Sequence, residues 1–345
     1  MSSLRGLVLL PLIICLGLWP NSARAAKPQK LRVYLDWYPD VEFTGMYVAL
    51  KNGKYKEAGI DLEMVFEGLD IIPSVINGKA DIGMHSAHDL IRWTSKNKGL
   101  KAFSAQYQLN PNSIVVGKDS NISSVKDLKG KTLGIFSSQE YDMYRIMLGF
   151  HGLKLGDVKF KKIKTFKEAE IVKLMQSKVI DAVIAWEFNW TITFPLLGYE
   201  VRVFPGYDNG FHFYGIVFFA PENFIKKNTE LLAKFLKITY DGWRDAYKDP
   251  EYFANFVVEN HIAKERYING SKEITQKQQF LELTLRQRYF LEGVGEAGIG
   301  RMSRFKWEKS LDISKRYGLV PKNSSLRAED LYDDSVMDLV LGNKP

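Results

Sequence analysis

Two tryptophans of this chain stand where apolar runs give way to polar residues. Trp37 ends the run "LRVYLDW" and precedes Tyr38, and Trp186 ends "IDAVIAW" and precedes Glu187. Aromatic rings offer flat faces on which a planar molecule stacks, and a carboxylate accepts hydrogen bonds from an amino group. We therefore predict that Trp37 and Trp186 form the two faces of a ligand clamp, with Tyr38 and Glu187 beside them. The alternatives are ordinary packing for the aromatic residues and a helix-start position for Glu187.

Two further segments place polar side chains after an apolar run. His85 and Ser86 lie in "MHSAHD", while Ser138 and Glu140 lie in "FSSQEYD", just before a predicted helix. Serine at such a position often caps the helix, and a helix N-terminus also attracts anions, so both roles are compatible. We predict all four residues as ligand contacts. His85 and His88 have H-x-x-H spacing, but the sequence offers no third ligand nearby, and we expect no metal site.

The segment "YDNGFHFYG" (residues 207–215) contains Tyr214, which we predict as a ligand contact, with a hinge role as the alternative. Asn189 and Trp190 in "AWEFNW" are further candidates. The sequence contains none of the G-x-S-x-G, H-E-x-x-H or Walker motifs. The lack of these motifs does not exclude an enzyme. Since no residue pattern argues for catalysis, we expect no catalytic residue and no cofactor.

The candidate residues belong to two stretches that repeat one order of elements: strand, helix, strand, helix, strand. Alternating strands and helices predict parallel sheets with right-handed crossovers. In such sheets, ligands bind beyond the carboxyl ends of the strands, where the four candidate segments lie. The predicted elements are strands 31–37, 61–67 and 80–86 with helices 44–56 and 71–78, then strands 131–138, 158–164 and 180–186 with helices 141–152 and 166–178.

The duplicated order predicts an α/β protein of two lobes, each a mostly parallel sheet flanked by helices. We expect the strand in residues 210–222 to cross back from the second lobe to the first. The chain after residue 222 is mostly helical in pattern and should pack on the first lobe. The predicted first lobe therefore comprises residues 30–117 and 216–345, and the second comprises residues 118–215.

The first 25 residues have the pattern of a signal peptide. Arg5 provides a short positive region, "GLVLLPLIICLGLW" is apolar, and a small-x-small sequence precedes Ala26. We predict cleavage before Ala26 and export to the periplasm or the cell exterior. Cleavage would remove Cys15, the single cysteine, and with it any disulfide or thiolate metal site. A membrane anchor and a lipoprotein site at Cys15 are the alternatives.

The remaining composition is that of an ordinary globular protein. Removal of Arg5 and Arg24 would lower the formal charge from +8 to +6. The densest basic cluster, "KFKKIK" (residues 159–164), lacks any nucleic-acid-binding motif, so we expect no nucleic-acid partner. We expect a monomer.

Several segments resemble the substrate-binding proteins of ABC transporters. They are "LDWYPDVEFTGMYVALKNGKYKEAGIDLEM", "INGKADIGM", "SSVKDLKGKTLGIF" and "FHFYGIVFFAPENFIKKNTELLAKFLK". The resemblance covers residues 30–320 and is nearest to the branch that binds thiamine-pyrimidine (formylaminopyrimidine) precursors, which is related to sulfonate-binding proteins. It implies a type II periplasmic-binding-protein fold, a small planar nitrogenous ligand and a membrane permease as partner.

The same resemblance leaves two alternative functions. Thiamine-pyrimidine synthase is a related enzyme that needs a pyridoxal-phosphate lysine, a donor histidine and iron ligands. Pyrimidine-binding members typically have a histidine at the position of Phe43 in "YPDVEFTG". The second alternative is a sensory binding protein that docks on a membrane receptor, as some proteins with similar C-terminal segments do.

Overall fold

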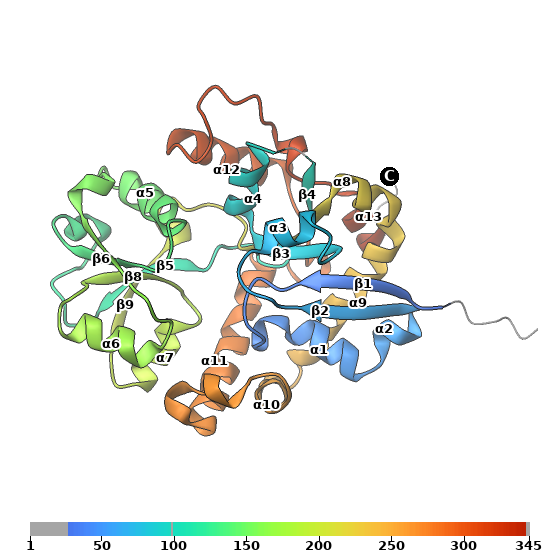
Figure 1. Ribbon diagram of the computed structural model, residues 1–345, viewed down its shortest axis with the longest axis horizontal. Helices are drawn as coiled ribbons and strands as arrows, with labels where there is room; N and C mark the ends of the chain where they lie inside the picture. Colours follow the sequence, from blue (N-terminus) through green and yellow to red (C-terminus); the bar gives the residue numbers. More distant parts are fainter. Residues whose placement is uncertain (1–26, 98, 343–345) are drawn as a thin grey trace, which may run out of the picture.

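The computed structural model describes residues 27–97 and 99–342, so the predicted signal peptide and its cleavage site lie outside the described residues. Two five-stranded sheets form two lobes that lie side by side, with helices around each (Figure 1). The strands of the first lobe are β1 (Gln29–Tyr34), β2 (Ile60–Val65), β3 (Ile82–Ser86), β4 (Leu100–Ala105) and β10 (Ile216–Pro221). Those of the second are β5 (Asn112–Gly117), β6 (Thr132–Ile135), β7 (Lys159–Lys162), β8 (Ala182–Trp186) and β9 (Val201–Pro205).

The two sheets have the same layout. Their strand orders are β2-β1-β3-β10-β4 and β7-β6-β8-β5-β9, so β1 corresponds to β6 and β3 to β8. The predicted strand–helix repeat accounts for the three parallel strands of each sheet. The sheets are mixed: β10 and β5 pair antiparallel with both of their neighbours, while the other four strands of each sheet run in one direction, as expected for a mostly parallel sheet. Both strands enter from the other lobe and therefore run in the opposite direction.

The helices between the strands follow the sequence pattern closely. The predicted helix 44–56 is divided into α1 (Thr44–Lys51) and α2 (Lys54–Glu57), because Gly53 has a φ of +69° and interrupts the α-helical backbone. The other helices of the repeats are α3 (Ile71–Ile76), α4 (Ala87–Thr94), α5 (Glu140–Phe150), α6 (Glu168–Gln176) and α7 (Trp190–Leu196).

Two chain segments cross between the lobes, one connecting β4 to β5 and the other β9 to β10. Backbone hydrogen bonds join them: Gly215 N donates to Tyr107 O at 3.0 Å, and Tyr107 N donates to Ile216 O at 3.1 Å. The predicted crossing before β10 is therefore present. The first crossing comes earlier than predicted, since β5 pairs with β8 and β9. The expected end of the first lobe's segment at residue 117 thus includes one strand of the second sheet, because an apolar run does not reveal which sheet a strand joins.

The chain after residue 221 is helical, as predicted, and most of it packs on the first lobe. Gly242 of α9 lies so close to Gly45 of α1 that an added Cβ would meet the Gly45 carbonyl, which explains the close packing of these two helices. Helix α11 lies between the two lobes and also contacts α7 (Figure 1). These helices are α8 (Glu222–Lys227), α9 (Thr229–Ala246), α10 (Pro250–Asn260), α11 (Lys272–Leu291), α12 (Arg304–Arg316) and α13 (Ser335–Leu341).

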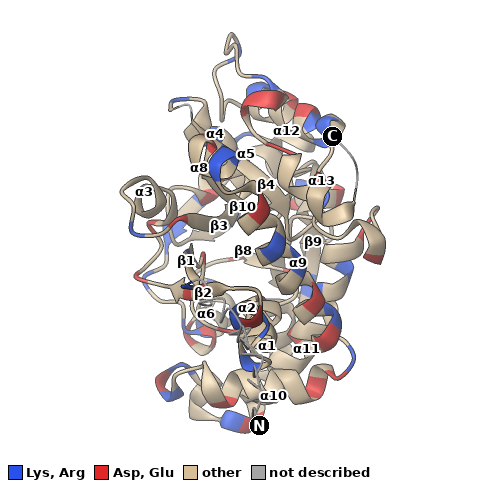
Figure 2. Cartoon of the chain, turned by 90° about the vertical axis from the view of Figure 1, so that its right-hand side faces the viewer, with Lys and Arg blue, Asp and Glu red and all other residues tan. Residues whose placement is uncertain are grey.

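Charged side chains of both signs are interspersed over the helices seen in Figure 2. No helix within residues 27–97 and 99–342 is both long enough and apolar enough to cross a membrane.

Candidate ligand-binding site

A cavity of about 610 Å³ lies between the two lobes, at the carboxyl ends of β1, β3, β6 and β8. This volume is in the range of small-molecule sites. Residues of α11 close one side of the cavity. Six of the residues predicted from the sequence line it, and they come from both lobes: Trp37, His85, Ser86, Ser138, Glu140 and Trp186. Asn189 and Trp190 line it as well.

The two predicted clamp residues have different surroundings. The Trp37 ring lies edge-on to Phe166 of the second lobe, with 5.6 Å between centroids, and Phe166 stacks on Phe136. Trp186 packs edge-to-face on Phe188 at 5.4 Å and on Tyr107, a residue of the first crossing, at 6.2 Å. Trp37 therefore stands on a loop at the cavity, whereas Trp186 is also part of the packing between the lobes.

Tyr38 and Glu187 do not line the cavity, contrary to the prediction. The Tyr38 ring packs on Phe66, and the Arg266 guanidinium lies 3.7 Å from its centroid. Glu187 N donates to Pro111 O at 2.8 Å. Both residues follow a tryptophan that faces the cavity. Tyr38 lies in a bend after β1 and Glu187 in the turn after β8, and the chain direction changes at both places.

Tyr214 and Phe43 are also absent from the cavity wall. Tyr214 is buried, its hydroxyl accepts a hydrogen bond from Ser303 N at 2.7 Å, and its ring packs on Trp307. It therefore stabilises the crossing before β10, in line with the hinge alternative. Phe43 is buried in the core of the first lobe, edge-on to Tyr47. Contact with a ligand in this cavity is thus not available to either residue.

The two histidines of the H-x-x-H segment have separate environments. His85 lines the cavity next to Ser86, while His88 is buried and edge-on to Phe211. Burial lowers the pKa of both histidines, and the nearby Asp89 carboxylate opposes that shift. Among the described residues, no group of three or more His, Cys, Asp or Glu side chains is arranged to hold a metal ion.

The segment before α5 uses most of its polar atoms on the backbone. Ser137 Oγ accepts a hydrogen bond from Gln139 N at 3.3 Å, and Glu140 Oε2 accepts one from Phe136 N at 2.9 Å. Burial raises the pKa of Glu140 to about 7, although these backbone donors oppose the shift. Neither serine caps α5, whose N-cap residue is Gln139 without a side-chain cap, and both Ser137 and Ser138 line the cavity.

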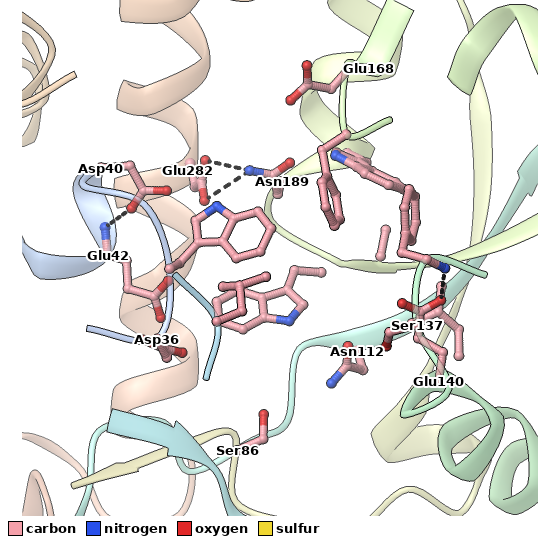
Figure 3. A pocket seen from close by; sticks show the side chains of 18 of the residues that line it. Asp36, Asp40, Glu42, Ser86, Asn112, Ser137, Glu140, Glu168, Asn189 and Glu282 are labelled. Atoms are coloured by element: carbon pink, nitrogen blue, oxygen red, sulfur yellow. Dashed lines mark hydrogen bonds between the residues drawn. The ribbon is translucent and has the colours of Figure 1, made fainter. Parts of the chain in front are cut away.

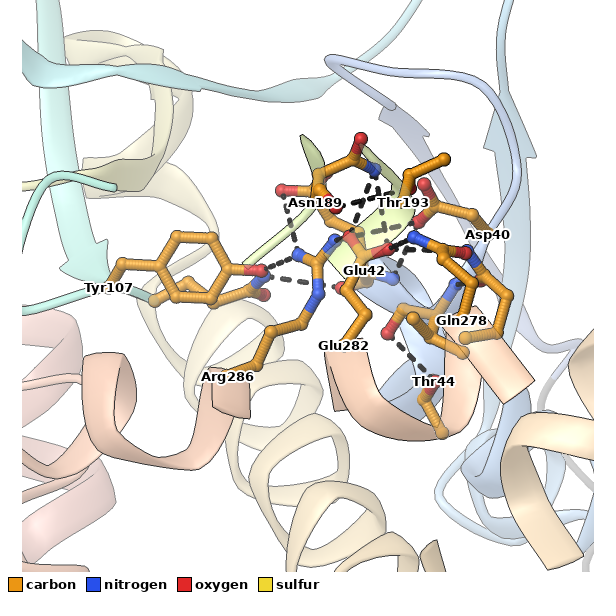
Figure 4. A network of polar contacts seen from close by, with 12 residues as sticks. Asp40, Glu42, Thr44, Tyr107, Asn189, Thr193, Gln278, Glu282 and Arg286 are labelled. Carbon is orange, nitrogen blue, oxygen red and sulfur yellow. Dashed lines mark hydrogen bonds and ion pairs between the residues drawn. The ribbon is translucent and has the colours of Figure 1, made fainter. Parts of the chain in front are cut away.

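A buried group of charged residues closes the side of the cavity next to the first lobe. We call it the Arg286 cluster; it comprises Asp36, Asp40, Glu42, Glu282 and Arg286. The first three follow β1, and the last two lie on α11. Figure 4 shows the guanidinium between Tyr107 on one side and the carboxylates on the other. No member of this cluster was predicted from the sequence.

The hydrogen bonds of the Arg286 cluster are unevenly shared. Arg286 donates to Glu282 and to the Tyr107 hydroxyl. Glu282 also accepts from Asn189 and Gln279, each at 3.3 Å. Its charge is thus balanced and its oxygens are satisfied.

The negative charges of the other three carboxylates, Asp36, Asp40 and Glu42, are less well balanced by donors and cations. Arg286 Nη1 lies 3.7 Å from Glu42 Oε1, and Arg286 Nη2 lies 4.0 Å from Asp40 Oδ1. Asp40 Oδ1 accepts from Glu42 N at 2.7 Å and so caps the short 3-10 helix at Val41–Phe43. Burial raises the pKa of Asp36 to about 7 and that of Glu42 well above its usual range, with the Arg286 charge opposing both shifts.

The cavity as a whole combines aromatic faces with an excess of negative groups. Figure 3 shows Asp36, Asp40 and Glu42 on one side and Ser137 and Glu140 on the opposite side. Such a site suits a ligand with an aromatic body and hydrogen-bond donors at its edge. Seven carboxylates line it against two guanidinium groups: Asp36, Asp40, Glu42, Asp89, Glu140, Glu168 and Glu282, against Arg266 and Arg286.

Solved structures with a similar fold include periplasmic binding proteins. The alkanesulfonate-binding protein SsuA from Xanthomonas axonopodis pv. citri, bound to MOPS, aligns with a TM-score of 0.63 and 15% identity. The alignment covers 89% of this chain and 99% of that one. The sulfonate-binding protein from Methylobacillus flagellatus KT aligns equally well, with a TM-score of 0.63 and 14% identity over 92% of this chain and 94% of that one. The predicted two-lobed periplasmic-binding-protein fold is confirmed.

Sequence comparison identifies relatives and a family. The formylaminopyrimidine-binding protein of Halalkalibacterium halodurans is 24% identical over 67% of this chain and 71% of its own length. The riboflavin-binding protein RibY of Chloroflexus aurantiacus is also 24% identical, over 67% of this chain and 68% of its own. The profile of the family described as NMT1/THI5 like matches residues 40–252, more than half of the chain. This chain therefore belongs to the NMT1/THI5-like family.

Proposed function

We propose that this chain is the substrate-binding protein of an ABC importer and that it captures a planar, nitrogen-containing molecule in the cavity between its lobes. The observation that carries the proposal is the cavity wall itself, in which Trp37 and Trp186 accompany an excess of carboxylates. The tryptophans would contact the faces of a planar ring. The carboxylates would accept hydrogen bonds from its amino or ring N–H groups.

The charge of the cavity argues against an anionic ligand. A sulfonate would need cationic or neutral donors that are free to bind it. Arg286 already donates to Glu282 and Tyr107, and the Arg266 guanidinium lies over the Tyr38 ring. The likeness to sulfonate-binding proteins therefore extends to the fold, while the lining residues support a different ligand.

The names of the relatives agree with this chemistry. Formylaminopyrimidine and riboflavin, which name two relatives, are both built on flat nitrogen heterocycles. An aminopyrimidine of this kind is our first candidate for the ligand. Phe43, in the position of the family histidine, lies in the core, so loss of that histidine leaves the cavity wall unchanged.

Transport would use the two crossings as a hinge. Closure of the lobes around the ligand is the usual switch in this fold, and the closed form is the one presented to a membrane permease. Trp37 contacts Phe166 of the other lobe at the cavity, and Arg92 of α4 pairs with Asp142 of α5 at 3.4 Å outside it. Export by the N-terminal signal peptide, with cleavage before Ala26, is part of this proposal.

Calorimetric titration with a 4-aminopyrimidine derivative, riboflavin and methanesulfonate tests the proposed ligand class. We expect the aminopyrimidine to bind to the wild-type protein and to bind more weakly to Trp37→Ala. Phe305→Ala is the matched control, because Phe305 is 74% exposed on α12 and far from the lining residues. Selective binding of the sulfonate would contradict the proposal.

Two further experiments separate the alternatives. Affinity purification of membrane partners should recover a permease, whereas recovery of a receptor kinase would favour the sensory function. Incubation with iron and pyridoxal phosphate should yield no pyrimidine product, and a single-turnover product would instead favour the synthase.

A further inference from the structure

Glu42 is a buried carboxylate that no protein donor satisfies. Its exposed fraction is 0%. Neither Oε1 nor Oε2 has a hydrogen-bond partner among the described residues, and Asp36 Oδ1 is in the same condition. Leaving a buried charged group without hydrogen bonds is costly. Three unpaired oxygens at one place therefore need an explanation.

The residues around Glu42 do not supply the missing donors. The guanidinium of Arg286 is the nearest cation, and its 3.7 Å distance from Glu42 Oε1 exceeds hydrogen-bond range. Arg286 Nη1 donates to Tyr107 and Nη2 to Glu282 instead, while Nε has no partner among the described residues and forms no hydrogen bond with Glu42. Gln106 Nε2 donates to the Glu42 carbonyl at 3.3 Å, not to its carboxylate.

The unpaired oxygens are buried and belong to two residues of the cavity wall. Asp36 and Glu42 both belong to the cavity wall, and Trp37 stands next to Asp36 in the chain. In Figure 3 the carboxylates of Asp36 and Glu42 point toward one another from neighbouring positions. A group held between them would lie beside a ring that rests on Trp37.

We propose that Asp36 and Glu42 form a subsite for a protonated, N–H-donating nitrogen of the ligand, such as a primary ammonium or an amidinium group. This inference rests on the proposed function, since it assigns one end of the same ligand. A cation with several N–H donors would satisfy the three oxygens together and balance their charge. A quaternary ammonium group would supply charge without donors and would leave the oxygens unpaired.

The competing explanation is a proton shared between Asp36 and Glu42, with no ligand involved. Close carboxylates often share a proton in this way. A shared proton would make the subsite neutral, and a ligand amine would then gain little over an alcohol of the same shape. The two explanations therefore differ in the selectivity that they predict.

The test is calorimetric titration at pH 7.5 with two matched pairs of probes. The first pair is 4-amino-5-(aminomethyl)pyrimidine and 4-amino-5-(hydroxymethyl)pyrimidine. The second is benzylamine and benzyl alcohol, with benzyltrimethylammonium as a third member. We expect each amine to bind at least about tenfold more tightly than its alcohol, because a charge-assisted hydrogen bond replaces a neutral one. Benzyltrimethylammonium should bind more weakly than benzylamine.

Variants assign this selectivity to the two carboxylates. Glu42→Gln and Asp36→Asn keep the side-chain shape and should each reduce the preference for the amine to within about threefold. Glu67→Gln is the control, because Glu67 is an exposed carboxylate of the same lobe that pairs with Lys79 on the surface. It should keep the wild-type preference. Circular dichroism checks that each variant is folded.

The outcomes separate this inference from the proposed function. Equal affinity of amine and alcohol in both pairs, or no binding of either amine at millimolar concentration, overturns the inference. If both pyrimidines bind equally, the proposed function stands and the inference fails. If the benzyl pair shows preference for the amine and neither pyrimidine binds, the subsite stands and the pyrimidine ligand is wrong. The wild-type comparison decides these cases even if a variant does not fold.

Discussion

Corresponding strands of the two lobes end in different chemistry. In the first lobe, β1 leads to Asp36 and Trp37, and β3 ends in His85 and Ser86. In the second, β6 leads to Phe136, while β8 ends in Trp186. Five of the seven lining carboxylates thus come from the first lobe and α11, whereas four of the five lining Phe and Trp rings come from the second lobe, which also brings polar residues.

This difference shows how a duplicated fold specialises. The same strand order places both sets of residues at one cavity, because the carboxyl ends of the inner strands face each other. The identity of the residues at those ends then decides which part of a ligand each lobe contacts. In our account, Trp37 and Trp186 hold the ring from opposite lobes, and the carboxylates of the first lobe recognise the nitrogen groups at its edge.

The largest expected effect is on stability and comes from substitution of Arg286, the cation of the Arg286 cluster. Arg286→Met would leave Glu282 buried without its charge partner, and breaking such a buried pair typically costs about 3–5 kcal/mol. We expect a large fall in the free energy of unfolding, measured by urea denaturation. Arg304→Ala is the control, because Arg304 pairs with Glu308 and Glu329 at the surface. The free energy of unfolding of this variant should hardly differ from that of the wild type. Similar stability of both variants would contradict a structural role for Arg286.

The variants Trp37→Ala and Trp186→Ala should both bind the ligand more weakly, but they should differ in thermal stability. Removal of one stacking face should weaken binding by roughly 5- to 150-fold, since stacking on a base contributes about 1–3 kcal/mol. We expect this for both Trp37→Ala and Trp186→Ala, measured by calorimetry. Only Trp186→Ala should also lower the melting temperature clearly, because Trp186 packs on Tyr107 and Phe188. Full affinity in either variant would remove that tryptophan from the clamp.

The buried carboxyl groups of the acidic side should contribute stability to the ligand-free protein that declines as pH rises from about 4, the usual carboxyl pKa, to about 7. Burial raises the pKa of Asp36 and of Glu282 to about 7, so the folded state holds protons that the unfolded state has already lost. Asp36→Asn should therefore flatten the decline in melting temperature over this range. Comparison with the wild type isolates this group from His85 and His88, whose lowered pKa values act in the opposite direction. An unchanged slope would contradict burial of an ionisable Asp36.

The smallest expected effect concerns the contact between the lobes outside the cavity. Arg92 is partly exposed and reaches Asp142 of the second lobe, so Arg92→Ala should weaken ligand binding by less than about fivefold. Arg145→Ala is the matched control, because Arg145 pairs with the same Asp142 within α5 and links no lobes. An equal effect of both substitutions would show that the link between the lobes is irrelevant to binding.

Much of this architecture was predictable from the sequence, because the duplicated order of strands and helices produces local patterns of apolar and polar residues. Strand and helix periodicity located the three parallel strands of each sheet, and glycines located helix ends. Polar residues at strand ends then indicated the cavity, and six of nine predicted site residues line it. Tyr38 and Glu187 do not line it, because a bend after β1 and a turn after β8 place them elsewhere, and a strand pattern does not reveal the course of such a turn. Tyr214 was wrong because its hydroxyl serves the crossing instead.

The Arg286 cluster was not predictable in the same way. It joins residues after β1 to residues of α11 about 240 positions later, and no local pattern links them. A weaker signal was present within α11. Gln278, Glu282 and Arg286 are spaced by four residues and share one helix face, where a scaffold helix would usually place apolar side chains.

Native mass spectrometry of protein purified from its host without refolding tests the central claim most directly, with wild type and Trp37→Ala compared in parallel. Our account predicts that the wild-type protein carries one small nitrogen-containing aromatic molecule and that Trp37→Ala has lost it. A bound sulfonate, or a molecule that both proteins retain equally, would contradict the account.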